Sequence, residues 1–315
     1  MKVLIAYDGS ECATAALEDL KRAGLPKTVE ALVISVADVV MPPDDETTDG
    51  GLPDYVPQGV RRARNHAEQQ LRQAETIAKS ASEHLKEMFP EWQVRYEAVA
   101  DSPAWALISK ADQWKADLVV VGARGHSVFG GRLILGSVSQ RVLYEAACTV
   151  RIARGEKKDR NDPIRVLLAV DNSPDSLAAV AAVCRRVWPK GTKVYLLAVV
   201  DTVMAINPNP AEPALTKWIE VQDNWDEVRK AFEPSANKLR QVGLDADVII
   251  RRGDPKDEVS AEAQSLGADC IFLGARGTRG IDRLLLGSVS AAVAARAHCS
   301  VEVVRERQKS LSAGG

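Results

Sequence analysis

This chain repeats itself, and the repetition restricts its possible folds more than any other feature. Three blocks occur twice, in the same order. The matching pairs are residues 3–10 with 166–173, residues 120–125 with 272–277, and residues 132–139 with 283–290. Repetition of this kind indicates two copies of one folding unit. At 315 residues the chain is long enough for two domains of ordinary size.

A polar segment separates the two copies. It runs from Gly155 to Pro163, consists mostly of charged residues and ends in proline, as a linker between domains does. The sequence therefore predicts one domain at residues 1–157 and a second at residues 163–306.

Each half alternates between short apolar segments and helical patterns. In the first half, strands are predicted at residues 2–7, 31–36, 93–99, 117–121 and 150–153, with helices between them. Ser10 and Ser102 are expected helix N-caps, and Gly24 stands where a glycine ends a helix. The second half repeats this order. The alternation predicts an α/β fold of two tandem, doubly wound, Rossmann-like domains, each with a five-stranded parallel sheet.

Composition narrows the function. Lys plus Arg number 41 and Asp plus Glu 43, a formal net charge of -2, which argues against an overall basic nucleic-acid binder. No apolar run approaches the roughly 18–20 residues that span a bilayer, and the N-terminus is typical of a first strand rather than a signal peptide. The five cysteines and four histidines show no metal-ligand spacing. We expect a cytoplasmic protein with reduced thiols, no metal site, and no nucleic-acid or membrane partner.

Residues suited to anion binding follow the predicted strands. Asp8 and Asp171 follow the first strand of each half, and Gly122 and Gly274 each open a glycine-rich loop that leads into a helix. In doubly wound sheets, ligands bind beyond the carboxyl ends of the strands, where the strand order reverses. Glycine amides and a helix N-terminus suit a polyphosphate, and the aspartate suits a ribose hydroxyl or a phosphate-bound cation. Glycines after a strand are equally common in plain tight turns.

The full spacing is more specific. Gly274-x2-Gly277-x9-Gly287-Ser288, with Asp171 after the first strand, resembles the ATP-binding signature of the universal stress protein family. The resemblance covers the chain up to about residue 306. It implies an adenine nucleotide alpha hydrolase-like fold, in which tandem members are common, and ATP as the cofactor, with or without Mg²⁺.

The resemblance also implies individual roles. Val199 would contact the adenine, Asp171 the ribose and phosphates, and Gly274 and Gly277 the phosphates. Arg276, between these glycines, is either a phosphate clamp or a solvated loop residue. The remaining positions implied for binding are Gly287, Ser288 and Val289 in the second half, and Asp8, Val36, Gly122, Gly125, Gly136, Ser137 and Val138 in the first.

The first half departs from the pattern. Ten residues separate Gly125 from Gly136, where the family has nine, and Ala100 replaces the glycine that the second half carries at Gly253. An extra residue in a phosphate loop either bulges harmlessly or displaces the amide donors. The sequence therefore favours nucleotide binding in the second domain.

The leading functional hypothesis is an ATP-binding, stress-response regulator bound to adenine nucleotide. We assign no catalytic residue, because no Walker lysine follows the glycines and no His–Asp pair is evident, so any ATP hydrolysis is expected to be slow. A nucleotide-free interaction scaffold remains an alternative. So does an enzyme on the same scaffold, such as an ATP-consuming ligase or a flavin-type domain, although Asp8-Gly9-Ser10 lacks the Ser-Gly-Gly-x-Asp-Ser loop of such ligases.

The last strand of each half predicts how the halves assemble. Residues 149–153 and 300–304 would be exposed edge strands unless paired. The resemblance implies that this edge is an interface, so we expect the two halves to form a pseudo-dimer within one chain. A further homodimer and a downstream protein partner are left open. The polar insertion at residues 42–59 is expected to be a flap near the first ligand site, and residues 309–315 a disordered tail.

Overall fold

The computed structural model describes residues 1–42, 58–123, 135–154, 162–200, 225–277 and 286–306. Three expectations lie largely or wholly outside these residues: the flap at 42–59, the linker at 155–163 and the tail at 309–315. Within them, the helices and strands follow the predicted order.

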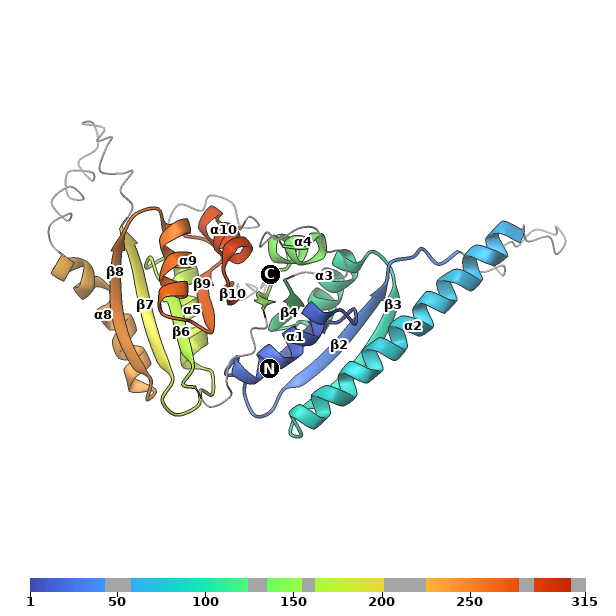
Figure 1. The fold of residues 1–315 in the computed structure, drawn as a ribbon, viewed down its shortest axis with the longest axis horizontal. Coiled ribbons are helices and arrows are strands. Elements are labelled where there is room, and N and C mark those ends of the chain that lie inside the picture. The colour runs from blue at the N-terminus through green and yellow to red at the C-terminus, as the bar shows by residue number, and fades with distance from the viewer. Residues whose placement is uncertain (43–57, 124–134, 155–161, 201–224, 278–285, 307–315) are drawn as a thin grey trace, which may run out of the picture.

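The first half alternates strands and helices along the chain (Figure 1). Its elements are β1 (Lys2–Ala6), α1 (Glu11–Asp19) with the 3₁₀ turn η1 (Leu20–Arg22), β2 (Glu30–Ala37), α2 (Gln58–Met88), β3 (Gln93–Ala100), α3 (Pro103–Trp114), β4 (Leu118–Gly122), α4 (Ser137–Glu145) and β5 (Thr149–Ala153).

The second half repeats the first. Its elements are β6 (Arg165–Ala169), α5 (Pro174–Cys184), β7 (Lys193–Val200), α8 (Trp225–Gln241), β8 (Asp245–Arg252), α9 (Pro255–Ser265), β9 (Cys270–Gly274), α10 (Ser288–Arg296) and β10 (Ser300–Val304).

The predicted helix ends are confirmed, with one difference. The side chain of Ser10 accepts a hydrogen bond from Ala13 N at 3.1 Å and so caps α1. Gly24 has a φ of 61°, the left-handed conformation expected of a glycine after a helix. Ser102 is the N-cap of α3 by position, but its side chain makes no capping hydrogen bond to a described residue; Pro103 at the first helical position starts this helix.

The described strands form one ten-stranded sheet. Its order is β3-β2-β1-β4-β5-β10-β9-β6-β7-β8. Every neighbouring pair is parallel except β5 and β10, which pair antiparallel at the centre. The predicted pairing of the two last strands is therefore confirmed, and it joins two five-stranded parallel sheets into a single mixed one (Figure 1).

The two faces of the sheet are covered differently. On one face, α3, α4, α9 and α10 share a single hydrophobic core that continues through both halves. On the other face, α1 and α2 cover the first half and α5 and α8 cover the second, as two separate cores. Side chains alternate between the faces along each strand, so Leu4 joins the shared core while Val3 and Ile5 face α1 and α2. Burying one such side chain stabilises the fold by about 1.5–3 kcal/mol.

Helix α2 is the longest helix described, and it begins at Gln58, two residues before the start at Val60 that the sequence pattern predicts. Its inner face buries Ala78 and Leu85 against the first-half core. Its outer face carries charges of both signs, with Glu68 between Arg64 (3.4 Å) and Arg72 (3.6 Å). One end of α2 projects beyond the sheet (Figure 1). None of the described helices is both long and apolar enough for a membrane span.

Candidate functional site

Both halves reverse their strand order at the same place. In the first half β1 lies between β2 and β4, and in the second half β6 lies between β7 and β9. Asp8 follows β1 and Gly122 ends β4, while Asp171 follows β6 and Gly274 ends β9. Because β1 is parallel to β4 and β6 is parallel to β9, each aspartate and its glycine lie at the same edge of the sheet. This edge is where open α/β sheets bind ligands.

Each aspartate begins a turn that leads into a helix. Oδ1 of Asp8 accepts a hydrogen bond from Ser10 N at 3.0 Å, and Oδ1 of Asp171 accepts one from Ser173 N at 3.0 Å. Both serine side chains then accept a hydrogen bond from the first turn of the helix that follows, α1 or α5. One carboxylate oxygen thus builds the turn, and Asp171 remains exposed to solvent.

The residue inside each turn has a left-handed backbone. Gly9 has a φ of 78° and Asn172 a φ of 61°. Glycine adopts this conformation freely and asparagine tolerates it better than most residues. The sequences Asp-Gly-Ser and Asp-Asn-Ser therefore both form the same turn, which explains why the two halves differ in sequence at this position.

Gly277 lies directly against the carboxylate of Asp171. A methyl group on Gly277 would lie 2.7 Å from Oδ2 of Asp171, closer than side-chain carbons approach other atoms. A methyl group on Gly287 would lie 3.1 Å from Ala275 O and 3.8 Å from Gly277 N. Asp171, Gly277 and Gly287 therefore form one continuous strip, along which the two glycines leave the backbone uncovered by side chains.

Gly274 meets a different constraint. A methyl group there would lie 2.6 Å from the carbonyl carbon of Asp175, so glycine allows the first turn of α5 to approach the end of β9. The carbonyl oxygen of Gly274 accepts a hydrogen bond from the buried Ser290 hydroxyl at 2.6 Å. In the first half, Ser139 donates to Gly122 O in the same way at 2.6 Å. These bonds hold the first turns of α4 and α10 against the ends of β4 and β9.

Helix α10 begins without a side-chain cap. Gly287 is its N-cap, and no side chain of a described residue caps it. Ser288 at the first helical position is exposed, and Val289 after it is half-buried. Residues 136–138 repeat this arrangement at the start of α4. A helix that begins this way presents backbone N–H groups and a partial positive charge to an anion.

Val199 and Val36 lie near the ends of β7 and β2, half-buried against the shared core. Val170, the residue that follows β6, donates its backbone N–H to Leu197 O of β7 at 3.0 Å. In a parallel sheet, residues two apart direct their backbone groups to the same side. Val199 therefore directs its N–H and C=O past the end of β6, toward the turn at Asp171. Val36 stands in the same relation to the end of β1.

Asp175, which the sequence analysis did not single out, holds the loop after β9. Its carboxylate is 2% exposed and accepts hydrogen bonds from the backbone N of Arg276 at 3.1 Å and from Nε at 2.9 Å. The hydrogen bonds that Asp175 accepts from the Arg276 guanidinium raise the pKa of Arg276. Ser173 Oγ also donates to Arg276 O at 3.2 Å. The guanidinium is thus bound by the chain's own carboxylate. The sequence shows that Asp175 is an acidic residue in the first turn of a helix, but it does not show that Asp175 binds Arg276, which lies 101 residues further along the chain.

Comparison with known proteins decides the family. The model described as "Universal stress protein family" matches residues 1–154 and again residues 164–305. The chain belongs to the universal stress protein family. The two matches confirm the tandem duplication predicted from the repeat.

Relatives of this universal stress protein match it along most of its length. A universal stress protein of Mycolicibacterium smegmatis is 30% identical over 215 residues, which are 68% of this chain and 69% of that one. The crystal structure of a universal stress protein from Archaeoglobus fulgidus has the same fold, with a TM-score of 0.65 and 20% identity over 96% of this chain and 98% of that one.

Two solved structures of relatives contain an adenine nucleotide. One is a universal stress protein in complex with cAMP, which covers 45% of this chain and 97% of its own at 22% identity and a TM-score of 0.33. The other is an Arabidopsis thaliana family member with AMP bound, which covers 48% of this chain and 97% of its own at 21% identity and a TM-score of 0.32.

The two halves of this universal stress protein differ beside the aspartate. Counting from Asp8 and Asp171, the position of Asp175 is occupied by Cys12 in the first half. The first half therefore has no carboxylate at the position from which Asp175 binds Arg276 in the second. Gly125, a predicted site residue of the first half, lies outside the described residues.

A second difference follows the third strand of each half. Gly253 has a φ of 155°, and a methyl group on it would lie 2.6 Å from the carboxylate of Glu258. The prediction that Ala100 takes the place of Gly253 is wrong. Asp101 N donates to Ala37 O at 3.1 Å just as Gly253 N donates to Val200 O at 3.1 Å, so Asp101 is the counterpart of Gly253, and Ala100 ends β3 as Arg252 ends β8. Asp101 has no positive φ, so the two halves leave their third strands with different backbone conformations.

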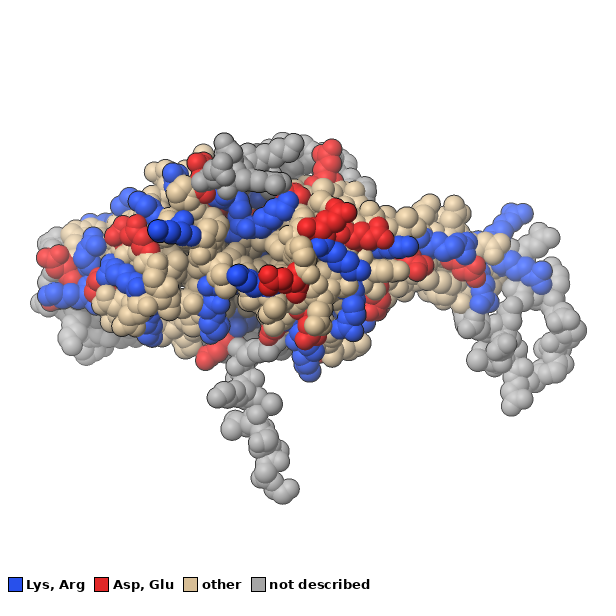
Figure 2. Space-filling model, turned by 90° about the horizontal axis from the view of Figure 1, so that it is seen from below, with Lys and Arg blue, Asp and Glu red and all other residues tan. Residues whose placement is uncertain are grey.

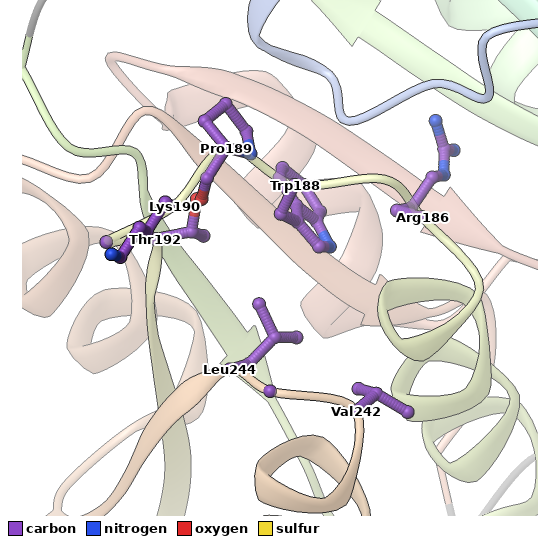
Figure 3. A pocket seen from close by; sticks show the side chains of 9 residues that line it. Arg186, Trp188, Pro189, Lys190, Thr192, Val242 and Leu244 are labelled. Carbon is purple, nitrogen blue, oxygen red and sulfur yellow. The ribbon is translucent and has the colours of Figure 1, made fainter.

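A small cavity lies at the opposite edge of the sheet, at the amino ends of β7 and β8. Its volume is about 130 Å³, and Trp188, Lys190, Val242 and Leu244 are among the residues that line it (Figure 3). Ligand pockets are usually roughly 300–1,000 Å³. Figure 2 shows the molecule from below, and over the described residues of that face Lys and Arg are interspersed with Asp and Glu.

Proposed function

We propose that the second half of this universal stress protein binds ATP at the carboxyl ends of β6 and β9, and that the nucleotide-bound chain acts as a stress-response regulator. The observation that carries this proposal is the contact of Asp171 with Gly277 and of Gly277 with Gly287. A carboxylate, a bare loop backbone and a helix start meet there in one strip. This is the chemistry that a sugar-linked polyphosphate needs.

Each group in the strip has a role in the proposal. The first-turn amides of Ser288 and Val289 hold the terminal phosphates, assisted by the partial positive charge at the start of α10. Gly277 and Gly287 allow the phosphates to approach the backbone. Asp171, which is exposed at this edge of the sheet, contacts a ribose hydroxyl or Mg²⁺ carried by the phosphates. Val199 directs its backbone N–H and C=O toward the adenine.

Arg276 is given a positioning role. Its guanidinium is paired with the buried carboxylate of Asp175, and its backbone is tied to Ser173. It therefore keeps the loop in place for the phosphates, because the hydrogen bonds from Nε and Nη2 to Asp175 fix the guanidinium against α5.

The first half is proposed as the weaker site, or as a half that serves only as a scaffold. Asp8, Val36, Gly122 and residues 136–138 take the same positions in their half as their counterparts in the second. Two features set the first half apart. Cys12 stands where the second half has the carboxylate of Asp175, and the loop between Gly125 and Gly136 is one residue longer than its counterpart. We propose that both differences lower the affinity of the first half for phosphate, because preorganisation is what converts contacts into affinity.

Binding and regulation, rather than fast turnover, fit the described residues. The Asp171 carboxylate already accepts a hydrogen bond from its own turn, and no Walker lysine follows the loop glycines in the sequence. We propose that ATP is held and at most slowly hydrolysed.

The test is nucleotide content and affinity of the full chain. Protein purified without added nucleotide and then heat-denatured is expected to release adenine nucleotide, measured by chromatography. Titration calorimetry with Mg-ATP then gives the affinity. A bound ligand also raises the melting temperature by mass action. Absence of released nucleotide together with an unchanged melting temperature at millimolar Mg-ATP would refute the proposal.

Gly277→Ala is the sharpest variant. Its backbone φ lies outside the left-handed range, so alanine introduces only the clash with Asp171 Oδ2. We expect ATP affinity to fall about tenfold, equivalent to about 1.4 kcal/mol, because the carboxylate must move. Gly59→Ala, which meets no atom within 4 Å and whose φ also lies outside the left-handed range, is the control. A Gly277→Asp/Ser288→Val double variant should abolish binding while the fold is retained. If that variant binds ATP normally, the nucleotide-free scaffold is the better description.

A further inference from the structure

The two halves meet around one residue pair. Strands β5 and β10 are antiparallel, with Val150 opposite Val303, Arg151 opposite Glu302, and Ile152 opposite Val301. Arg151 and Glu302 are the middle residues of their strands and occupy equivalent positions in the repeat. An approximate two-fold axis therefore passes between them. In this register, any two last strands would bring their middle residues face to face.

Four buried charges form a row through this axis. Arg151 Nε lies 2.6 Å from Asp19 Oδ2, and Arg151 Nη1 lies 3.2 Å from Glu302 Oε2. On the far side, Arg186 pairs with the other oxygen of Glu302. Arg151 and Glu302 are 0% exposed. Along the row the charges alternate: negative on Asp19, positive on Arg151, negative on Glu302, positive on Arg186.

The arginine at the axis stays charged. Burial by itself lowers the pKa of Arg151, but the nearby carboxylate of Asp19, helped by Glu302, raises it above the ordinary value. A buried charge is tolerated only with such partners, because the cost of leaving water is several kcal/mol per ion.

Each half supplies the counter-charge for its own middle residue. Asp19 and Arg151 belong to the first half, and Arg186 and Glu302 to the second. Counting from Asp8 and Asp171, the second half has Ala182 where the first has Asp19, and the first half has Ala23 where the second has Arg186. Two first halves would therefore place two arginines together at the axis, and two second halves would place two glutamates together. Only the mixed pair alternates.

A separate contact has the same asymmetry. Trp188 of the second half packs on Gly24 of the first, where a methyl group would lie 2.7 Å from the indole ring. The second half carries Val187 at the position equivalent to Gly24. A pair of second halves would thus force a valine against each tryptophan.

Other contacts across the axis are symmetric and carry no such discrimination. Arg154 after β5 donates to Ala294 O near the end of α10, and Arg305 after β10 donates to Leu143 O near the end of α4, each at 2.5 Å. These equivalent arginines would make the same contacts in any pairing of the two edges. They strengthen the interface, and the choice of partner is left to the charged row and to Trp188.

We propose that the Arg151–Glu302 pair specifies which edges join: the last strand of a half accepts only a last strand whose middle residue has the opposite charge. The two halves of one chain satisfy this rule together, so homotypic joining of equal halves from two copies is excluded. The partner that this edge fits, other than its own second half, is the opposite half of another copy of this chain.

The test uses two full-length charge-reversed chains. In Glu302→Arg both edges carry an arginine, and in Arg151→Glu both carry a glutamate. When they are co-expressed with different affinity tags, the unaltered first half of one chain and the unaltered second half of the other can form the native alternating row. We expect capture of either tag to recover both chains at a one-to-one ratio, and native mass spectrometry to show the heterodimer.

Controls distinguish association through matched charges from non-specific association. Tagged and untagged copies of the same variant, co-expressed, should not capture each other, and neither should two wild-type copies, which satisfy the rule within each chain. Each single variant alone should melt roughly 10 °C or more below wild type, because it buries unpaired charge.

Several outcomes would overturn the proposal. One is a Glu302→Arg chain that stays a monomer with the wild-type melting temperature. Another is capture of like variants as efficiently as unlike ones. A third is insolubility of both variants even when co-expressed, since a native row is then available to them. The double variant Arg151→Met/Glu302→Met removes the buried charge from both strands and should fold. Co-expressed with either charge-reversed chain, it should not capture one of them in preference to the other. Such a preference would also count against the charge rule.

Discussion

Replacing Gly24 with alanine tests how tightly the two halves fit together. Gly24 has a φ of 61°, and three ring atoms of Trp188 would lie 2.7, 2.8 and 2.9 Å from the new methyl group. Carbon atoms in contact are normally about 3.5–4.0 Å apart. The indole cannot easily retreat, since its Nε1 donates to Val183 O at 2.9 Å and its ring packs edge-on against Phe272.

Two terms set the expected loss of stability. A left-handed alanine costs about 1–2 kcal/mol. Overpacking a fixed site costs about 1–3 kcal/mol more. The sum for Gly24→Ala is about 2–5 kcal/mol, which for a protein of this size corresponds to a fall in melting temperature of roughly 5–15 °C.

The assay is thermal and urea unfolding, with a control that separates the two terms. Gly243 has a φ of 86° and no atom within 4 Å of the position its methyl group would take, so Gly243→Ala introduces the backbone term alone. The difference between the two variants measures the clash. Trp188→Leu in the Gly24→Ala background should recover part of the loss. Equal melting temperatures for Gly24→Ala and Gly243→Ala would refute the reasoning, and the close packing of Trp188 on Gly24 with it.

Two further predictions concern buried titratable groups. Burial raises the pKa of the Cys270 thiol, so the folded state holds this proton when the unfolded chain has released it. The free energy of unfolding should therefore fall as the pH rises above about 8.5, the ordinary cysteine pKa, by up to about 1.4 kcal/mol per pH unit. Cys270→Val should reduce this loss in urea titrations from pH 7 to 10. An unchanged dependence of the unfolding free energy on pH would show that Cys270 does not cause the loss. Asp175→Asn places an amide against Arg276 and should cost about 1.5–3 kcal/mol in the same assay, because a charged hydrogen bond is lost. Cys12→Ser, at the equivalent position of the first half, should lower the stability less. Equal losses of stability in the two variants would show that the Asp175–Arg276 ion pair does not stabilise the fold.

The sequence predicted the architecture because the relevant signals are local. Alternating strands and helices, the cap at Ser10 and the left-handed Gly24 each depend on a few neighbouring residues. The repeat supplied the second half from the first. The pairing of β5 with β10 was also predicted, because each half has an edge strand that needs to be paired or covered and the family resemblance implies an interface at this edge.

The candidate site was only partly predictable. The order of the strands places Asp171 and the loop after β9 at one edge, and the glycine spacing indicated the residues. Asp175 was missed, because its importance depends on burial and on a partner far along the chain. Gly274 was interpreted as a phosphate contact, yet in the tertiary structure it first of all makes room for α5.

Sequence alone determined that this chain is a duplicated α/β protein with a glycine loop opposite an aspartate in each half. The tertiary structure alone decided which charges are buried and with whom. Arg151, in the middle of a predicted edge strand, is fully enclosed and meets Asp19 and Glu302 from distant parts of the chain. The reason is physical: helix and strand patterns arise from neighbouring residues, whereas the environment of a charge depends on every segment that folds over it.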